Sequence, residues 1–317
     1  MVELREKQFS AEKERSKEKL PKLEATFLYA PHWTSEDAGL IKEGIGHTDV
    51  YCPEMIGYPN EEVELLNRAS QGDIRAFRQL ISATDNPWWK GVYEAIYNSK
   101  KIIKPIDIPE GQHVVSDYQE SKIRNVRDVS FVQFSAGKFE QAIKLMENYL
   151  KEWAEYQKKR EELMLFNLRN LPQGIVKRNP EFKNKEKLKV LVSLGSAHSY
   201  LYHQIKKEKI SSQAKFIRMP FIMPIEDELW RKIRFKSDSK LDKNLISKIF
   251  IEDFLFKYLE KPEKDTSRVL EAARIAALKT DFNSVKEISK AIAENDISSI
   301  QRPSFVAGFL KKKGIIL

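Results

Sequence analysis

The 317-residue sequence lacks the features of several protein classes. Its single cysteine, Cys52, cannot form an internal disulfide or a CxxC metal site, which favours a reducing cytoplasm. No apolar run approaches the roughly 18–20 residues of a membrane span. The amino-terminal stretch also lacks the apolar segment of a secretory signal. We therefore expect a soluble, cytoplasmic protein without membrane association.

Four common catalytic or phosphate-binding motifs are also missing. The sequence contains no G-x-x-x-x-G-K-[ST], no G-x-G-x-x-G, no H-E-x-x-H and no G-x-S-x-G. Phosphate-loop, Rossmann, zincin and serine-hydrolase interpretations therefore lose their main support. Cys52 precedes Pro53 and has no basic activator beside it in the sequence, which favours a core cysteine over a nucleophile.

The positive charge is concentrated in one stretch. Hydrophobic residues make up 41% of the chain, which is enough for a packed core, and the net charge is +9. Residues 177–218 contain 11 Lys and Arg against 3 Glu, a net of +8. A solvated basic surface explains this run, and a positive field near an anionic substrate, a nucleic acid or a membrane is the alternative. Aromatic residues are sparse there, which argues against a nucleic-acid partner.

Apolar runs that alternate with helical patterns predict an α/β fold. The strand candidates are residues 25–31, 49–57, 101–109, 187–194 and 214–222. Strands separated by helices pair in parallel, so we expect a mainly parallel sheet flanked by helices.

The helical patterns divide the chain further. Three-four apolar spacing from about 134 to 171 predicts one long helix, whereas residues 110–130 read as irregular or partly helical. The expected organisation has three parts: a charged arm over 1–22, an α/β domain over 23–222 and a helical portion over 223–317.

Four residues stand where the predicted strands end. They are His32, Glu54, Asp107 and His198. Parallel sheets bind ligands at their carboxyl edge, and imidazoles with carboxylates hold divalent metals or perform acid/base chemistry. Each has a plainer alternative. Either histidine could be a turn residue bonded to backbone, the Glu could pair with Lys or Arg, and the Asp could form a turn.

Arg160 interrupts the apolar stripe of the long helix, one step of four residues after Tyr156. Its aliphatic stem could lie along the surface with the charge in water. Alternatively, its guanidinium points to a buried carboxylate or a substrate anion. We expect the second arrangement, with Glu54 or Asp107 as the partner.

Four segments resemble the TraB/PrgY/GumN family, which belongs to a wider group with erythromycin-esterase-like, ChaN-like and Tiki proteins. They are ATFLYAPHWTSEDAGLIKEGIGHTDVYCPEM, KPIDIPEG, KKREELM and VLVSLGSAH. In that family a G-x-x-H turn, a strand ending in Glu, an Asp-containing strand, an Arg-bearing helix and a second G-x-x-H follow in this order. Tyr29 replaces the first motif glycine, and the third strand lacks the Arg that often follows its Asp.

The resemblance implies a metal-dependent, peptidase-like hydrolase that uses Mn²⁺, Co²⁺ or Zn²⁺. His32 and His198 would be ligands, and Glu54 would be a ligand or the general base. Asp107 would be a ligand or support one, and Arg160 would orient Glu54 or stabilise an oxyanion. The alternative is a non-catalytic protein that binds metal, haem or a peptide, which the missing glycine favours. A nucleic-acid-associated protein is a third interpretation.

Overall fold

The computed structural model describes residues 20–30, 38–111, 113–195, 198–216, 223–236, 240–260 and 266–315. Five strands form one sheet in the order β3-β2-β4-β1-β5, and every pairing is parallel. The strands are β1 (Lys22–Ala30), β2 (Val50–Pro53), β3 (Ile102–Ile103), β4 (Lys187–Gly195) and β5 (Ser211–Phe216). The predicted α/β class with a parallel sheet is confirmed.

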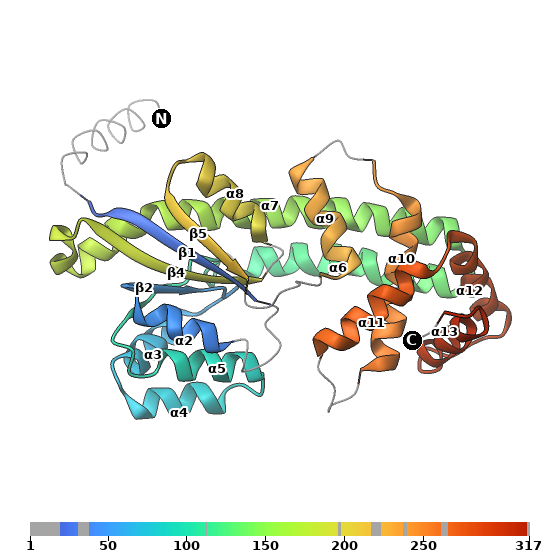
Figure 1. Ribbon diagram of the computed structural model, residues 1–317, viewed down its shortest axis with the longest axis horizontal. Coiled ribbons are helices and arrows are strands. Elements are labelled where there is room, and N and C mark those ends of the chain that lie inside the picture. The colour runs from blue at the N-terminus through green and yellow to red at the C-terminus, as the bar shows by residue number, and fades with distance from the viewer. Residues whose placement is uncertain are drawn as a thin grey trace.

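Helices cover both faces of the sheet (Figure 1). One face is covered by α2 (Gly39–Gly46), α3 (Asn60–Ser70) and α5 (Pro87–Ile96), and α4 (Ile74–Ser82) packs on α3 and α5 in the same core. The other face packs against α7 (Phe139–Arg178) and α8 (Ser199–Lys207). The central strands are therefore buried on both sides, which explains their nearly continuous apolar sequence. Cys52 is a fully buried free thiol in this core, as predicted.

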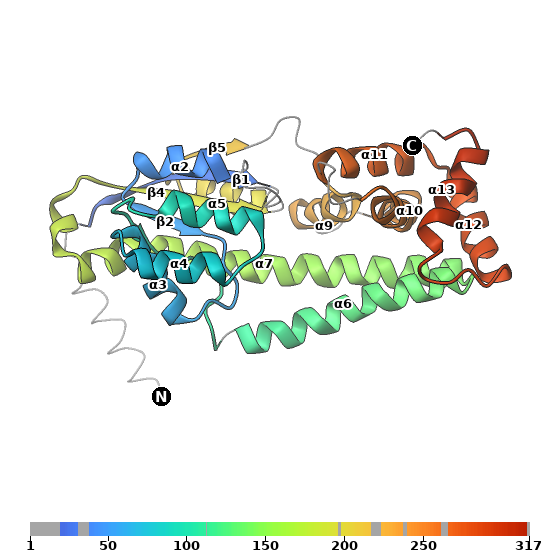
Figure 2. The ribbon, with the colours of Figure 1, turned by 90° about the horizontal axis from the view of Figure 1, so that it is seen from below.

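Helix α7 connects the sheet to a second, all-helical core. Its 40 residues span about 60 Å at 1.5 Å per residue. Side chains from its second half pack on the sheet, whereas those from its first half join a separate cluster. That cluster includes α6 (His113–Ser135), which runs beside α7 (Figure 2).

Five further helices complete the second core beyond the carboxyl edge of the sheet (Figures 1 and 2). They are α9 (Ile225–Phe235), α10 (Lys243–Leu259), α11 (Thr266–Lys279), α12 (Phe282–Glu294) and α13 (Arg302–Lys312). The expected helical character after residue 223 is confirmed. None of the described helices is long and apolar enough to cross a membrane.

Two helix predictions differ from the structure in extent. Of the two alternatives for residues 110–130, the partly helical one is confirmed, because α6 occupies most of them; its charged sequence hides a buried stripe that includes Ile123 and Phe134. The long helix extends from 139 to 178 rather than from 134 to 171. Pro172 does not end it, because Leu171 and Ile175 pack into the core on either side of the proline.

Three strands are shorter or shifted relative to the prediction. Strand β2 stops at Pro53, which has no N–H to donate. Strand β3 has two residues because its outer side is closed by Asn67, whose amide donates to the Ile103 carbonyl and accepts from the Ile103 N–H, at 2.8 and 2.9 Å. Strand β5 covers 211–216 rather than 214–222, and residues 217–222 lie outside the described residues.

A buried carboxyl in the helical core predicts a pH-dependent stability. Glu252 on α10 is 5% exposed, and its Oε2 accepts a hydrogen bond from the Ile225 N–H at 2.8 Å. Burial raises the pKa of Glu252 from 4.5 to about 8. The folded state therefore binds this proton more tightly than the unfolded chain does. The stabilisation is complete below pH 4.5 and is lost as the pH rises through about 8.

We expect Glu252→Gln to remove this pH dependence, because a neutral amide keeps the hydrogen bond without a charge. Between pH 4.5 and 8 the free energy of unfolding of the wild type should fall by a few kcal/mol relative to the variant. Denaturant titrations at several pH values measure the difference, and Glu260→Gln, at the end of the same helix, is the control. Parallel curves for wild type and Glu252→Gln would contradict the prediction.

Candidate functional site

Three of the predicted site residues meet at the carboxyl edge of the sheet. Glu54 directly follows β2, Asp107 follows β3 after a short turn, and His198 lies between β4 and α8. The strand order places β2 between β3 and β4, so three adjacent strands deliver these side chains to one place. Helix α7 crosses this edge and contributes Arg160.

Arg160 binds two carboxylates at once. Its Nε donates to Asp107 Oδ1 at 2.9 Å, its Nη2 donates to Glu54 Oε1 at 2.8 Å, and Nη2 also bonds Asp107 Oδ2. The arginine is 8% exposed and Asp107 is fully buried. The expected pairing of Arg160 with Glu54 or Asp107 is confirmed, and the structure shows both carboxylates bound; the alternative of a stem lying along the surface is wrong.

These contacts keep the guanidinium charged. Burial alone lowers the pKa of Arg160, but Asp107 and Glu54 raise it by more, so the pKa lies above its ordinary value. Both oxygens of Asp107 are occupied by Arg160, and Oδ1 also accepts from the Ile108 N–H. Asp107 therefore positions Arg160. It also supplies the opposite charge that the buried guanidinium needs.

His198 lies between two carboxylates. Its Nδ1 is 2.9 Å from Glu161 Oε1, and its Nε2 is 3.1 Å from Glu54 Oε1. Arg160 Nη1 is 3.4 Å from the same Nε2. His198 is 4% exposed and Glu161 is 2% exposed, so both side chains are held in place by packing as well as by these contacts. The alternative of a turn histidine bonded to backbone does not describe this side chain.

The position of Glu161 determines which nitrogen of His198 faces the site. The deeply buried Glu161 also pairs with Arg234 of α9, and its Oε1 is the acceptor that faces His198 Nδ1. An Nδ1–H donated to Glu161 leaves Nε2 with its lone pair toward Glu54. Two lone pairs 3.1 Å apart repel unless a proton or a metal cation lies between them. The 3.1 Å contact between Nε2 and Oε1 therefore accommodates either a shared proton or a bound cation.

A close backbone approach fixes the second oxygen of Glu54. The Gly195 N–H donates to Glu54 Oε2 at 2.6 Å. A Cβ at Gly195 would lie 3.4 Å from this oxygen, which is ordinary van der Waals contact, so the backbone N–H rather than the missing side chain is what matters here. Both Glu54 oxygens are therefore oriented by donors.

His32 lies within residues 31–37, outside the described residues. Its convergence with Glu54 and His198 therefore stays a prediction. Among the residues that the structure describes, no group of three His, Cys, Asp or Glu side chains is arranged to hold a metal ion. Glu54 and His198 supply two candidate donors on their own.

Sequence reasoning missed Glu161, Gln157 and Arg234. Gln157 and Glu161 follow Trp153 at steps of four on the buried stripe of α7, and Gln157 Oε1 is 3.5 Å from Arg160 Nη1. Polar residues at buried spacing could have revealed them. Arg234 belongs to a helix far along the chain, and its sequence carries no signal that it reaches Glu161.

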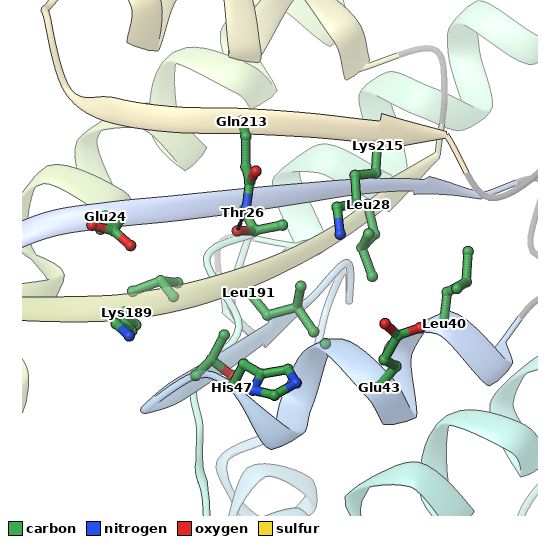
Figure 3. Close-up of a pocket in the computed structure, with 13 residues that line it drawn as sticks. Glu24, Thr26, Leu28, Leu40, Glu43, His47, Lys189, Leu191, Gln213 and Lys215 are labelled. Atoms are coloured by element: carbon green, nitrogen blue, oxygen red, sulfur yellow. Dashed lines mark hydrogen bonds between the residues drawn. The ribbon is translucent and has the colours of Figure 1, made fainter.

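A hollow elsewhere on the sheet is lined by none of the candidate site residues Glu54, Asp107, Arg160 and His198 (Figure 3). It has a volume of about 250 Å³ and lies between α2 and strands β1, β4 and β5. Its charged lining is mixed, with Glu24 and Glu43 against Lys189 and Lys215. His47 lines it from the end of α2, at the surface, as expected for that histidine. The hollow therefore shows no preference for a ligand of one charge.

Comparisons of the chain with models of protein families, with curated proteins and with solved structures found no match. The resemblance to the TraB/PrgY/GumN family therefore stays a prediction from four sequence segments.

The role of Glu161 can be tested on its own. We expect Glu161→Gln to lower divalent-cation affinity and any hydrolytic activity by about 10–100-fold, because the amide no longer fixes the ring orientation and tautomer of His198. Metal titration and activity assays measure the loss, and circular dichroism verifies the fold. Glu162→Gln, at the exposed neighbouring position of the same helix, is the matched control. Equal behaviour of the two variants would contradict the assigned role.

Proposed function

We propose that the protein is a metal-dependent, peptidase-like hydrolase that acts at the Glu54–His198 pair. The observation that carries this proposal is the 3.1 Å separation between His198 Nε2 and Glu54 Oε1, with Nδ1 committed to Glu161. When a buried carboxylate accepts a hydrogen bond from one ring nitrogen of a histidine, the second ring nitrogen is oriented to bind a metal or to transfer a proton.

The donors fit a divalent cation in two respects. Metal–ligand bonds of about 2.1 Å at angles of about 90–109° place two ligand atoms about 3.0–3.4 Å apart, and the observed separation of 3.1 Å lies in that range. The set is one imidazole and one carboxylate without a thiolate, which suits Mn²⁺, Co²⁺ or Zn²⁺. Glu54 and His198 would hold the ion, with His32 as the third ligand. When bound, the cation would activate water and polarise the carbonyl of the substrate.

The residues of the chain have separate tasks in this proposal. Glu54 accepts a proton from the attacking water while the water oxygen bonds to the carbonyl carbon of the substrate. The proton then passes from Glu54 to the leaving amine as the C–N bond breaks. Arg160 holds Glu54 ionised and oriented, and Asp107 holds Arg160. His198 is held by Glu161, which is itself anchored by Arg234. The protein would act in the cytoplasm, with no membrane or nucleic acid as its partner.

One observation favours a non-catalytic alternative, a protein that binds metal, haem or a peptide for regulation. The described residues bring only two donors, Glu54 and His198, to the candidate cation position. A cation with two protein ligands would have to be completed by His32 or by a bound partner. Binding without turnover distinguishes this alternative from the hydrolase.

Hydrolysis of a quenched-fluorescent peptide library tests the proposal. The full-length protein should cleave library members with Mn²⁺, Co²⁺ or Zn²⁺ present, and a chelator should abolish cleavage. Glu54→Gln should lower kcat/KM by about 10²–10⁴-fold, as expected for loss of a general base. Glu64→Gln, on the exposed side of α3, should not. Metal binding without cleavage in any condition would contradict the hydrolase and favour the binding protein.

A further inference from the structure

A cavity of about 580 Å³ opens beside the candidate site. Glu54 and Arg160 line it, together with residues of α3, α4 and α5, the helices on one face of the sheet (Figure 1). Its volume lies within the range of about 300–1,000 Å³ that is typical of small-molecule sites. The cavity thus has Glu54 and Arg160 of the site on one side and side chains of α3, α4 and α5 on the other, so that part of a ligand could lie against these helices.

One acidic side chain in this cavity has no counter-ion within the part of the chain that the structure describes. Glu62 of α3 lines the cavity and is half-buried. Burial raises its pKa, and hydrogen bonding from the Tyr93 hydroxyl only partly offsets that effect. No Lys, Arg or His among the described residues forms an ion pair with Glu62, and no cation contributes to its pKa. A ligand that carries a positive charge would stabilise the ionised form of this half-buried carboxylate.

Aromatic and aliphatic side chains surround this carboxylate. Trp89 and Tyr93 of α5 both line the cavity, and their rings stack with centroids 5.8 Å apart and an interplanar angle of 29°. Leu65 and Leu80 line it from α3 and α4. Ring faces attract ammonium groups, and aliphatic side chains pack against an alkyl stem.

The charges of the described lining residues disfavour an anionic ligand. Among these residues, Glu54 and Glu62 stand against one cation, Arg160, whose guanidinium is already bound by Asp107 and Glu54. An acidic group would meet the Glu62 carboxylate, which pairs with no cation among the described residues, whereas a cation would neutralise it. An alkyl chain that ends in an ammonium group matches all three features: the apolar wall, the aromatic rings and the Glu62 carboxylate.

We propose that this cavity binds the side chain of a lysine in a peptide substrate, beside the bond to be cleaved, with its stem against Leu65 and Leu80 and its ammonium at Glu62 and Trp89. As a specificity subsite this inference rests on the proposed function. As a binding site for an alkylammonium group it does not. Glu62 is then a specificity-determining residue, separate from the Glu54–His198 pair.

Equilibrium binding tests the ammonium site without requiring turnover. The probes are Nα-acetyl-lysine methylamide and Nα-acetyl-norleucine methylamide, which differ in the terminal charged group, titrated calorimetrically into the full-length protein. We expect the lysine probe to bind about tenfold more tightly or better, as for a charge-assisted hydrogen bond. Glu62→Gln should remove the preference, and the exposed neighbour Glu61→Gln should retain it.

Two results would overturn the inference: equal affinity of the two probes for the wild type, or an unchanged preference in a folded Glu62→Gln. A pair of peptide substrates with lysine or norleucine at one position separates this inference from the proposed function. Lysine-selective binding without cleavage of either peptide supports the ammonium site and contradicts the hydrolase. Cleavage of both peptides at equal rates supports the hydrolase and contradicts the lysine subsite.

Discussion

Arg160→Met is expected to lower the free energy of unfolding by about 3–5 kcal/mol. The substitution removes one partner of a buried ion pair and leaves the Asp107 carboxylate buried without an opposite charge. Asp107 is fully buried and both of its oxygens are bound by this guanidinium. Methionine keeps most of the aliphatic stem, so the loss reports on the charge rather than on packing. Denaturant titration at neutral pH measures it.

The same variant should lose function while it stays folded. Without Arg160, Glu54 loses the donor that orients its Oε1, and cation binding and hydrolysis should both fall sharply. Arg169→Met is the matched control, because Arg169 lies on the same helix and pairs with Glu208 at the exposed surface, with a contribution of about 0–1 kcal/mol. Adding Asp107→Asn to Arg160→Met should recover part of the stability. If Arg160→Met is as stable and active as Arg169→Met, the assigned role is wrong.

His198→Ala is expected to weaken divalent-cation binding by 100-fold or more and to lower kcat/KM by about 10²–10⁴-fold. The substitution removes the nitrogen that faces Glu54 Oε1, and the remaining carboxylate is already shared with Arg160. Calorimetric titration with Mn²⁺, Co²⁺ or Zn²⁺ measures the affinity, and the peptide assay measures kcat/KM.

The exposed His47 provides the control for His198, since it lies at the end of α2 outside the site. His47→Ala should bind cations and cleave peptides as the wild type does. Unaltered cation binding in His198→Ala would mean that the ion binds elsewhere. In that case the imidazole of His198 would be a structural link between Glu54 and Glu161.

Much of the site could be predicted from the sequence because each residue obeys a local rule. Glu54 and His198 follow apolar runs that could only be buried strands, and parallel strands bring their carboxyl ends to one edge. Arg160 is detectable because it replaces an apolar residue on a periodic stripe. These signals depend on neighbours in the sequence, so they need no knowledge of the tertiary fold.

The remaining features depend on contacts between distant segments. Arg234 reaches Glu161 only because α9 packs on α7, and nothing near residue 234 reveals this. Helix α6 was expected only as one of two alternatives because its buried stripe is narrow and interrupted by charges. Strand β3 is short because an amide from α3 pairs with its outer edge, which is a tertiary contact.

The most direct test of the account is the anomalous difference density of crystals of the full-length protein soaked with Mn²⁺ or Zn²⁺. The account predicts one peak about 2.1 Å from both Glu54 Oε1 and His198 Nε2, the two atoms that lie 3.1 Å apart. Arg160 and Glu161 should keep their contacts to Glu54 and His198 in the same crystals. The absence of a peak between the two atoms, with their hydrogen bond intact, would contradict the proposed metal site.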